Sequence, residues 1–285
     1  VPLAYYFSIL VSTAKFNFGK SMKSLSKNIN SSTLKSTDEL QDIMEKVLKL
    51  AKSQGVDEAS VAINHDIGFA VDVRMGEVET VAFSEDQGVG VNVYIGQSKG
   101  SASSNDISDN ALQDMLRAAI EIAEVSAHDP CFGLPDKDLF TNECKDLKLN
   151  FPWDLEPEQA IDMARYCESK ALDLDKRITN SDGVSISTYN FSLGHANTYG
   201  FSNTLYSSRH SVSCSLLAED AKGKQRDYDY TTSRDHTKLH NLDELDACTV
   251  ERMGSRLGAK LIKTQKLPVI FSSRISSGLF ASLMS

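Results

Sequence analysis

The chain has 285 residues, of which 41% are hydrophobic and 24% charged, and its formal net charge is −9. A chain of this length can form one large or two ordinary globular domains and bury their cores without disulfides or metals. Its acidic charge argues against a nucleic-acid groove, which needs clustered Lys and Arg, and no apolar run is long enough to cross a bilayer. The five dispersed cysteines form no CxxC pair and are typical of reduced thiols in a cytoplasmic protein.

The N-terminal segment differs from the rest of the chain in charge. Residues 1–37 hold five Lys and no acidic residue. The apolar run Val1–Leu10 precedes these charges, which is the reverse of a signal peptide, and a transit peptide would normally contain Arg. We therefore predict that residues 1–36 are disordered or extraneous, with Met22 as a plausible start.

Residues 37–135 are predicted to form an N-terminal α+β domain. Thr37 is a favourable N-cap for an amphipathic helix that Gly55 ends, and Ser108 begins a second such helix. Between the helices, alternation with a period of two predicts a meander of short strands, and Gly76 and Gly96 mark turns. The predicted strands are 60–64, 68–73, 78–83 and 89–94.

Residues 136–266 are predicted to form a central domain rich in helix and strand. A surface connection over 129–156 leads to a helix that begins at Glu156 and Pro157, because Pro is well tolerated in a first helical turn. The pattern then predicts strands over 178–218, an exposed hairpin or loop over 219–234, and a helix over 242–262.

The apolar run Leu267–Phe271 predicts a short buried strand, and residues 267–285 are predicted to be the start of a truncated C-terminal domain. The whole chain is therefore predicted to be α+β, with largely antiparallel sheets, flanking amphipathic helices and a two-part architecture.

Two short motifs have the spacing of catalytic patterns without their context. Gly96-Gln97-Ser98-Lys99-Gly100 matches GxSxG, but a nucleophile elbow needs a following helix and here a polar strand follows, so we interpret it as a hairpin turn. His236 and His240 have HExxH spacing, but Thr237 replaces the Glu that would activate water. We interpret His236 and His240 as surface residues.

Two further motifs are interpreted as structural. His128 lies close to Cys131 in sequence, but a catalytic Cys/His pair is usually assembled from distant segments. Gly88-Val89-Gly90 lacks the third Gly and the helix of a dinucleotide site. We therefore assign no catalytic residue, no cofactor-binding residue and no metal ligand in this chain.

The order of pieces between Arg74 and Leu134 resembles the TldD/PmbA family, specifically its PmbA (TldE) branch. The first piece is Arg74-Met75-Gly76-Glu77-Val78-Glu79-Thr80-Val81-Ala82-Phe83-Ser84, followed by Gly88–Tyr94, Gly100–Ser108 and Asp129–Leu134. The similarity extends from about Thr37 to Ser285 and includes Asp175–Ser181. Members of this family are considerably longer than this chain.

The resemblance also indicates which branch of the family applies. Members of the TldD branch carry a helix with H-E-x-x-x-H, in which two His can hold zinc and the Glu can act as base. At the corresponding positions this chain has Ala281 and Ser282, which supply neither ligand nor base. The resemblance therefore implies no cofactor in this chain, with zinc in the partner subunit.

The resemblance implies the non-catalytic subunit of a cytoplasmic heterodimer. Its TldD-like partner would supply zinc, water and base, and the substrates would be unfolded or extended peptides, including leader peptides of modified peptide antibiotics. No nucleic-acid or membrane partner is expected. Two alternatives stay open: a metal-independent peptide-binding scaffold without a protease partner, and an independent hydrolase that uses Ser98 or Cys131 with one of the six His.

Overall fold

The computed structural model describes residues 32–141 and 144–284, so the prediction of disorder for the N-terminal segment falls mostly outside the described residues. The helices are α2 (Thr37–Ser53), α3 (Asp109–Val125), α4 (Pro157–Leu174), α5 (Leu242–Arg256) and α6 (Ser273–Met284), with short 3-10 turns η1 (Lys137–Leu139) and η2 (His236–Lys238). The strands are β1 (Glu58–Arg74), β2 (Glu77–Ile95), β3 (Ser98–Ser104), β4 (Ile178–Asn197), β5 (Ser202–Asp220) and β6 (Gly223–Ser233).

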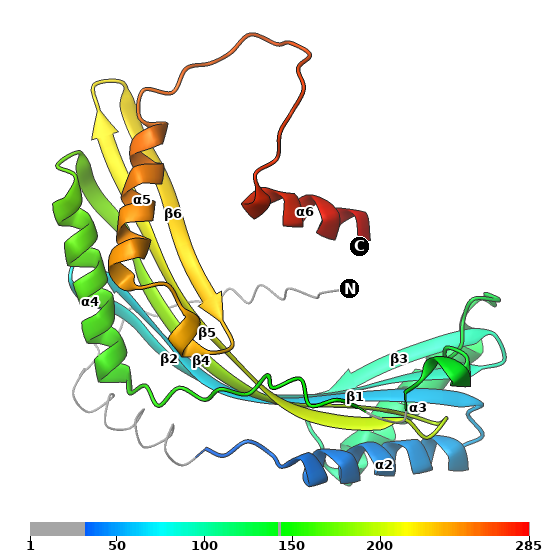
Figure 1. Cartoon of the computed structure of the whole chain (residues 1–285). Helices are drawn as coiled ribbons and strands as arrows, with labels where there is room; N and C mark the ends of the chain where they lie inside the picture. Colours follow the sequence, from blue (N-terminus) through cyan, green and yellow to red (C-terminus); the bar gives the residue numbers. More distant parts are fainter. Residues whose placement is uncertain (1–31, 142–143, 285) are drawn as a thin grey trace.

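The described strands form one antiparallel sheet in the order β3-β2-β1-β4-β5-β6, and the sheet is strongly curved (Figure 1). The α+β prediction is confirmed. Strand β1 pairs with β2 on one side and with β4 on the other, so a single sheet runs across residue 135. The domain boundaries at 36, 135 and 266 stay predictions.

The prediction of separate strands at 60–64 and 68–73 is wrong, because β1 is continuous. Its middle residues keep partners on both sides: Gly68 lies opposite Ser84 of β2 and opposite Tyr189 of β4. Pairing on both sides gives the backbone N–H and C=O groups of residues 65–67 their partners. The side chains of this stretch do not alternate between apolar and polar, so the sequence pattern did not show a strand there.

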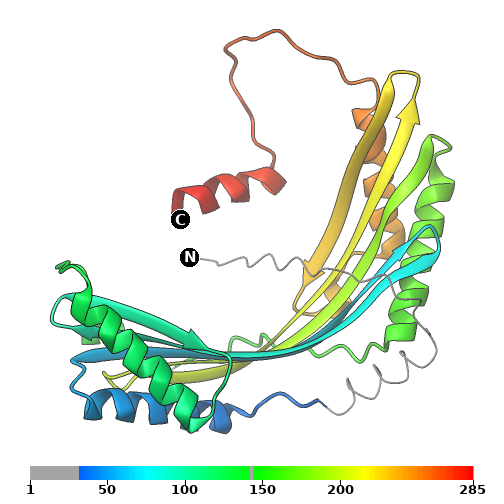
Figure 2. The same cartoon turned by 180° about the vertical axis from the view of Figure 1, so that it is seen from behind.

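Helices α2 to α5 pack on one face of the sheet, in two pairs (Figure 2). Helices α2 and α3 cover one half through Leu40, Met44, Leu112 and Leu116, which are fully or almost fully buried, with α2 packed on β1 and β4 and α3 on β2 and β3. Helices α4 and α5 cover the other half, where their apolar residues pack on β4 and β5. Each fully buried Leu, Ile or Met contributes about 1.5–3 kcal/mol.

The helix starts follow local capping chemistry. Ser36, one residue before the predicted Thr37, is the N-cap of α2 and forms a reciprocal capping box with Glu39. Ser108 is the N-cap of α3, and Pro157 is the first residue of α4, as predicted. No helix in the described part of the chain is long and apolar enough to cross a membrane.

The structure differs from the prediction near the end of the chain. Helix α5 ends at Arg256, before Gly258 with its φ of 74°, and does not continue to 262. Leu267–Phe271 is neither a strand nor buried: Ile270 is 96% exposed. That prediction is wrong because a strand needs a neighbour for its N–H and C=O groups, and no described strand lies beside this segment. Helix α6 then begins at Ser273.

Candidate functional site

The concave face of the sheet carries none of helices α2 to α5 (Figure 1). Along β1, Val61, Ile63 and Val71 point to the helices, so the alternate residues point to the concave side. We call this side the open face. Its side chains are mostly small or polar: those of β1 are Ala62, Asn64, Asp66, Gly68, Ala70 and Asp72, and those of β4 include Ser185, Ser187, Tyr189, Phe191 and His195.

Two aromatic side chains lie at the centre of the open face. The Tyr189 and Phe191 rings stack with centroids 6.3 Å apart. The Tyr189 ring lies directly over Gly68, where an added Cβ would overlap both the ring and the Thr188 carbonyl oxygen. Burial raises the pKa of the Tyr189 hydroxyl, with a smaller contribution from Asp66. The centre therefore presents an apolar platform with a neutral hydroxyl.

Charges on the open face are separated across the sheet. Asp66 of β1 lies opposite Asp86 of β2, and burial raises the pKa of Asp66. On the other side of the aromatic pair, Arg209 of β5 lies opposite Tyr189, and Arg226 of β6 points to the same face but pairs with Asp182 at 2.5 Å. An extended ligand across the strands would meet carboxylates at one end and the Arg209 guanidinium at the other.

Strands β3 and β6 are the edges of the sheet, and each pairs with only one described strand. Along β6, Arg274 of α6 stacks over the rings of Tyr228 and Tyr230, at 4.8 and 5.2 Å, and donates to Asp229 (2.9 Å) and the Tyr228 carbonyl (3.2 Å). Helix α6 thus touches the open-face side of this edge. A free edge offers backbone N–H and C=O groups to an extended peptide.

The GxSxG motif lies at a hairpin turn, as predicted. Strand β2 ends before Gly96, whose φ is 57°, and Ser98 begins strand β3 without a following helix. The Ser98 side chain is 5% exposed, and its hydroxyl donates to the Ser126 carbonyl at 3.0 Å. The Ser98 hydroxyl therefore links the hairpin to the end of α3.

The prediction that both His of the HTKLH segment are surface residues holds for His240 and is wrong for His236. His236 is half-buried, and its ring stacks on Trp153 with centroids 5.3 Å apart. The His210 ring lies nearly at right angles to the Trp153 and His236 rings. Its Nε2 donates to the Phe151 carbonyl at 2.9 Å. Burial is the main cause that lowers the pKa of His210.

The remaining predicted motifs are dispersed. Cys131 is exposed, and its backbone N–H donates to the Asp129 carboxylate at 2.9 Å; His128 is also exposed. Gly88 and Gly90 lie within strand β2 and precede no helix. Ala281 and Ser282 lie inside α6.

Sequence reasoning missed two groups of residues. The open face carries a weak signal, because Tyr189, Phe191 and Leu193 alternate with residues of the other face. The second group, Cys167, Cys214 and Asp246, comes from α4, β5 and α5 and is completely buried. No spacing in the sequence brings these three residues together.

Comparison with known proteins places these features in a family. Residues 59–123 match PmbA/TldA metallopeptidase domain 1, and residues 150–263 match the PmbA/TldA metallopeptidase central domain. The chain belongs to the PmbA/TldD family. The two matched regions correspond to the two halves of the curved sheet, β1–β3 with α3 and β4–β6 with α4 and α5.

The curated relatives are PmbA proteins, which agrees with the predicted branch of the family. Metalloprotease PmbA of Escherichia coli O157:H7 is 37% identical over 245 residues, which cover 86% of this chain and 54% of that protein. The PmbA homologue of Haemophilus influenzae is 34% identical over 243 residues, covering 85% of this chain and 54% of the homologue. The chain therefore spans about half the length of the curated relatives that it matches.

Solved structures share the fold at low sequence identity. A protein from Bacteroides thetaiotaomicron superposes with a TM-score of 0.75 at 20% identity, covering 86% of this chain and 57% of that chain. TldE from Thermococcus kodakarensis gives a TM-score of 0.60 at 13% identity, covering 74% of this chain and 47% of that one. The curved sheet is thus a fold that other solved proteins share.

Proposed function

We propose that this chain is part of the non-catalytic subunit of a cytoplasmic, heterodimeric zinc metallopeptidase of the PmbA/TldD family. A TldD-like partner would supply zinc, water and base, and the assembly would cleave unfolded or extended peptides, including leader peptides of modified peptide antibiotics. The observation that carries the proposal is the open face: a polar, concave sheet surface with an aromatic centre, bounded by the edge strands β3 and β6, each of which pairs with one described strand.

The open face suits an extended chain better than a compact ligand. Its small side chains let a peptide approach closely, and the Tyr189–Phe191 platform offers contact to side chains of many kinds. Backbone hydrogen bonds at a sheet edge require no particular peptide sequence. Separated acidic and basic residues would favour one direction of a peptide laid across the strands.

The chemistry of cleavage is assigned to the partner because the catalytic patterns in this chain lack the groups that they need. Ser98 donates to a backbone carbonyl rather than to a base, and Thr237 stands between the paired His. Ala281 and Ser282 stand where the resemblance places the zinc-binding helix. The role proposed for this chain is to bind and orient peptide.

The test compares this chain, in its full-length protein, with and without a TldD-like partner, using an unfolded peptide substrate. Chelator-sensitive cleavage that exceeds that of either protein alone is expected. Tyr189→Ala should raise KM severalfold with little change in kcat, because it removes a binding platform. Tyr166→Ala, an exposed tyrosine on helix α4, is the matched control.

Each alternative predicts a different outcome. A peptide-binding scaffold would bind extended peptide without a protease partner, and a TldD-like protein would not co-purify with it. An independent hydrolase would cleave peptide alone and in the presence of chelator, and Ser98→Ala or Cys131→Ala would abolish that cleavage. Either result would overturn the proposed role.

A further inference from the structure

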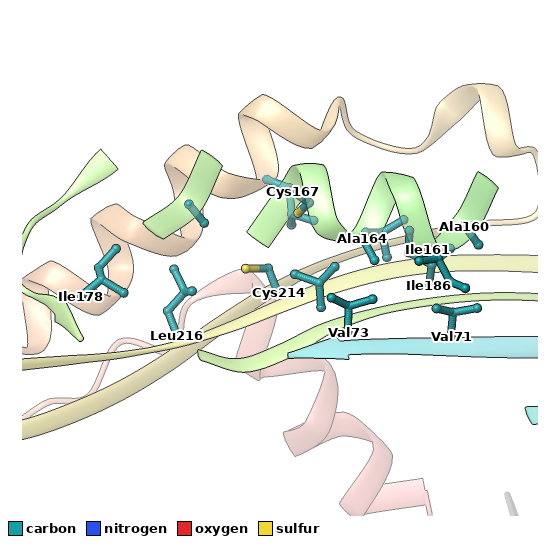
Figure 3. Packing of buried hydrophobic residues seen from close by; sticks show 14 of the residues in the cluster. Val71, Val73, Ala160, Ile161, Ala164, Cys167, Ile178, Ile186, Cys214 and Leu216 are labelled. Atoms are coloured by element: carbon teal, nitrogen blue, oxygen red, sulfur yellow. The ribbon is translucent and has the colours of Figure 1, made fainter. Parts of the chain in front are cut away.

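Three potential metal ligands converge in the core beneath helices α4 and α5. Cys167 comes from α4, Cys214 from β5 and Asp246 from α5, and their ligand atoms all lie within 4.8 Å of one another. Figure 3 shows Cys214 on the sheet, on the side that faces the helix carrying Cys167. All three residues are 0% exposed.

The carboxylate of Asp246 is incompletely satisfied. One oxygen accepts a hydrogen bond from Cys167 Sγ at 2.8 Å, and the other is buried without a hydrogen-bond partner among the described residues. No ion pair in the described part of the chain joins Asp246 to Lys, Arg or His. A buried carboxyl group is normally satisfied by hydrogen bonds, a cation, a metal or a proton, because burying an unpaired charge is costly.

Glu168, one residue after Cys167, shows what a satisfied buried carboxylate looks like in this protein. It is 1% exposed, and its two oxygens accept the N–H groups of Met75 and Gly76 at 2.9 and 2.7 Å. Asp246 has no equivalent set of donors. Its second oxygen therefore has room in its bonding for a group that is not among the described side chains.

We propose that Cys167, Cys214 and Asp246 bind one Zn²⁺ ion. Thiolates favour zinc over the hard cations Mg²⁺ and Ca²⁺, and zinc accepts carboxylate oxygen as well as sulfur. In a tetrahedral site with metal–ligand distances of about 2.0–2.3 Å, ligand atoms are separated by roughly 3.3–3.8 Å. The three ligand atoms, all within 4.8 Å of one another, would close to that separation around the ion.

Binding exchanges protons for the metal. The two thiols each release a proton, the carboxyl group releases its proton where it carries one, and the site with its ion has a net charge of −1. The ion would join α4 and α5 to β5 at one point in the core. The assignment of no metal ligand from sequence considered only spacings along the chain and had no means of finding this site.

The test uses the full chain, stripped of metal with a chelator under reducing conditions and then titrated with Zn²⁺ against a chromogenic chelator. One Zn²⁺ per chain should bind, and its binding should raise the melting temperature. Co²⁺ in its place should give the sulfur-to-cobalt charge-transfer absorption of thiolate ligands. Cys214→Ser and Asp246→Asn should each lose stoichiometric binding.

Cys248→Ser is the matched control, because Cys248 is an exposed cysteine on the same helix as Asp246. It should leave zinc binding and the cobalt absorption unchanged. Circular dichroism of each variant separates loss of the site from loss of the fold, and Asp246→Asn preserves side-chain volume. Absence of one-to-one binding by the folded chain would overturn the proposal. So would loss of the cobalt absorption in Cys248→Ser, or a Cys167–Cys214 disulfide in the freshly isolated protein.

Discussion

Replacing Glu168 with glutamine tests whether helix α4 holds the β1–β2 turn in place. The turn residues Met75 and Gly76 both have positive φ angles, 51° and 78°. For Met75 this conformation is uncommon, because it brings Cβ close to the backbone. The Glu168 carboxylate accepts both of their N–H groups, and Arg165 donates to the Gly76 carbonyl at 2.9 Å.

The expected loss follows from the two bonds. A hydrogen bond to a charged group contributes about 1.5–3 kcal/mol. Glutamine keeps one oxygen acceptor, now neutral, and turns a donor toward the other N–H group. We therefore expect Glu168→Gln to lower the free energy of unfolding by about 2–3 kcal/mol. The two side chains have nearly the same volume, so no cavity contributes.

Urea unfolding at pH 7, followed by circular dichroism, measures this change at constant m value. Asp162→Asn is the control, because it removes a carboxylate from an exposed position on the same helix. Surface substitutions of that kind usually change stability by less than about 0.5 kcal/mol. If the two variants lose the same stability, the Glu168 carboxylate does not hold the turn.

Two further predictions concern packing and pH. Gly100→Ala should destabilise by about 1–3 kcal/mol or more in urea unfolding, because its Cβ would overlap the backbone of helix α3, whereas Gly90→Ala has ordinary contacts and should not. His210 has a lowered pKa, so stability should fall as pH drops below about 6.5, the unfolded value, and fluorescence of nearby Trp153 should report the change. His210→Gln should flatten this dependence while His240→Gln does not; equal pH profiles would contradict it.

The helices could be predicted from sequence because their burial follows a local period. The apolar stripe of α2, with Leu40, Met44, Val47 and Ala51, is the buried set in the structure. The predicted strands were in the right places but too short. At Gly68, β1 continues because its backbone pairs with β2 and β4, although the side chains there do not alternate. The apolar run at Leu267–Phe271 failed for the opposite reason: it has the pattern of a strand and no described partner strand.

The candidate sites were harder to predict because they depend on neighbours distant in sequence. Tyr189 and Gly68 face each other only through the β1–β4 pairing. Cys167, Cys214 and Asp246 meet only after two helices pack on one sheet. Local motifs such as GxSxG, in contrast, were interpreted correctly because their chemistry requires a particular sequence of elements, which the flanking residues did not provide.

Polar residues at the bend of the sheet distinguish the helix-covered face from the open face, to which we assign the proposed binding of peptide. Between the two helix pairs, extended segments instead of helices cover the sheet. The Lys35 backbone N–H donates to His65 at 3.0 Å, the Ser208 N–H donates to the Leu149 carbonyl at 3.0 Å, and His210 donates to the Phe151 carbonyl at 2.9 Å. Extended segments carry backbone N–H and C=O groups that need hydrogen-bond partners, and apolar side chains could not supply them. The polar side chains at the bend therefore already bind these backbone groups. On the open face, Arg226 pairs with Asp182 and Arg274 stacks over Tyr228 and Tyr230, so the proposed binding of peptide depends on the central Tyr189–Phe191 pair and on Arg209.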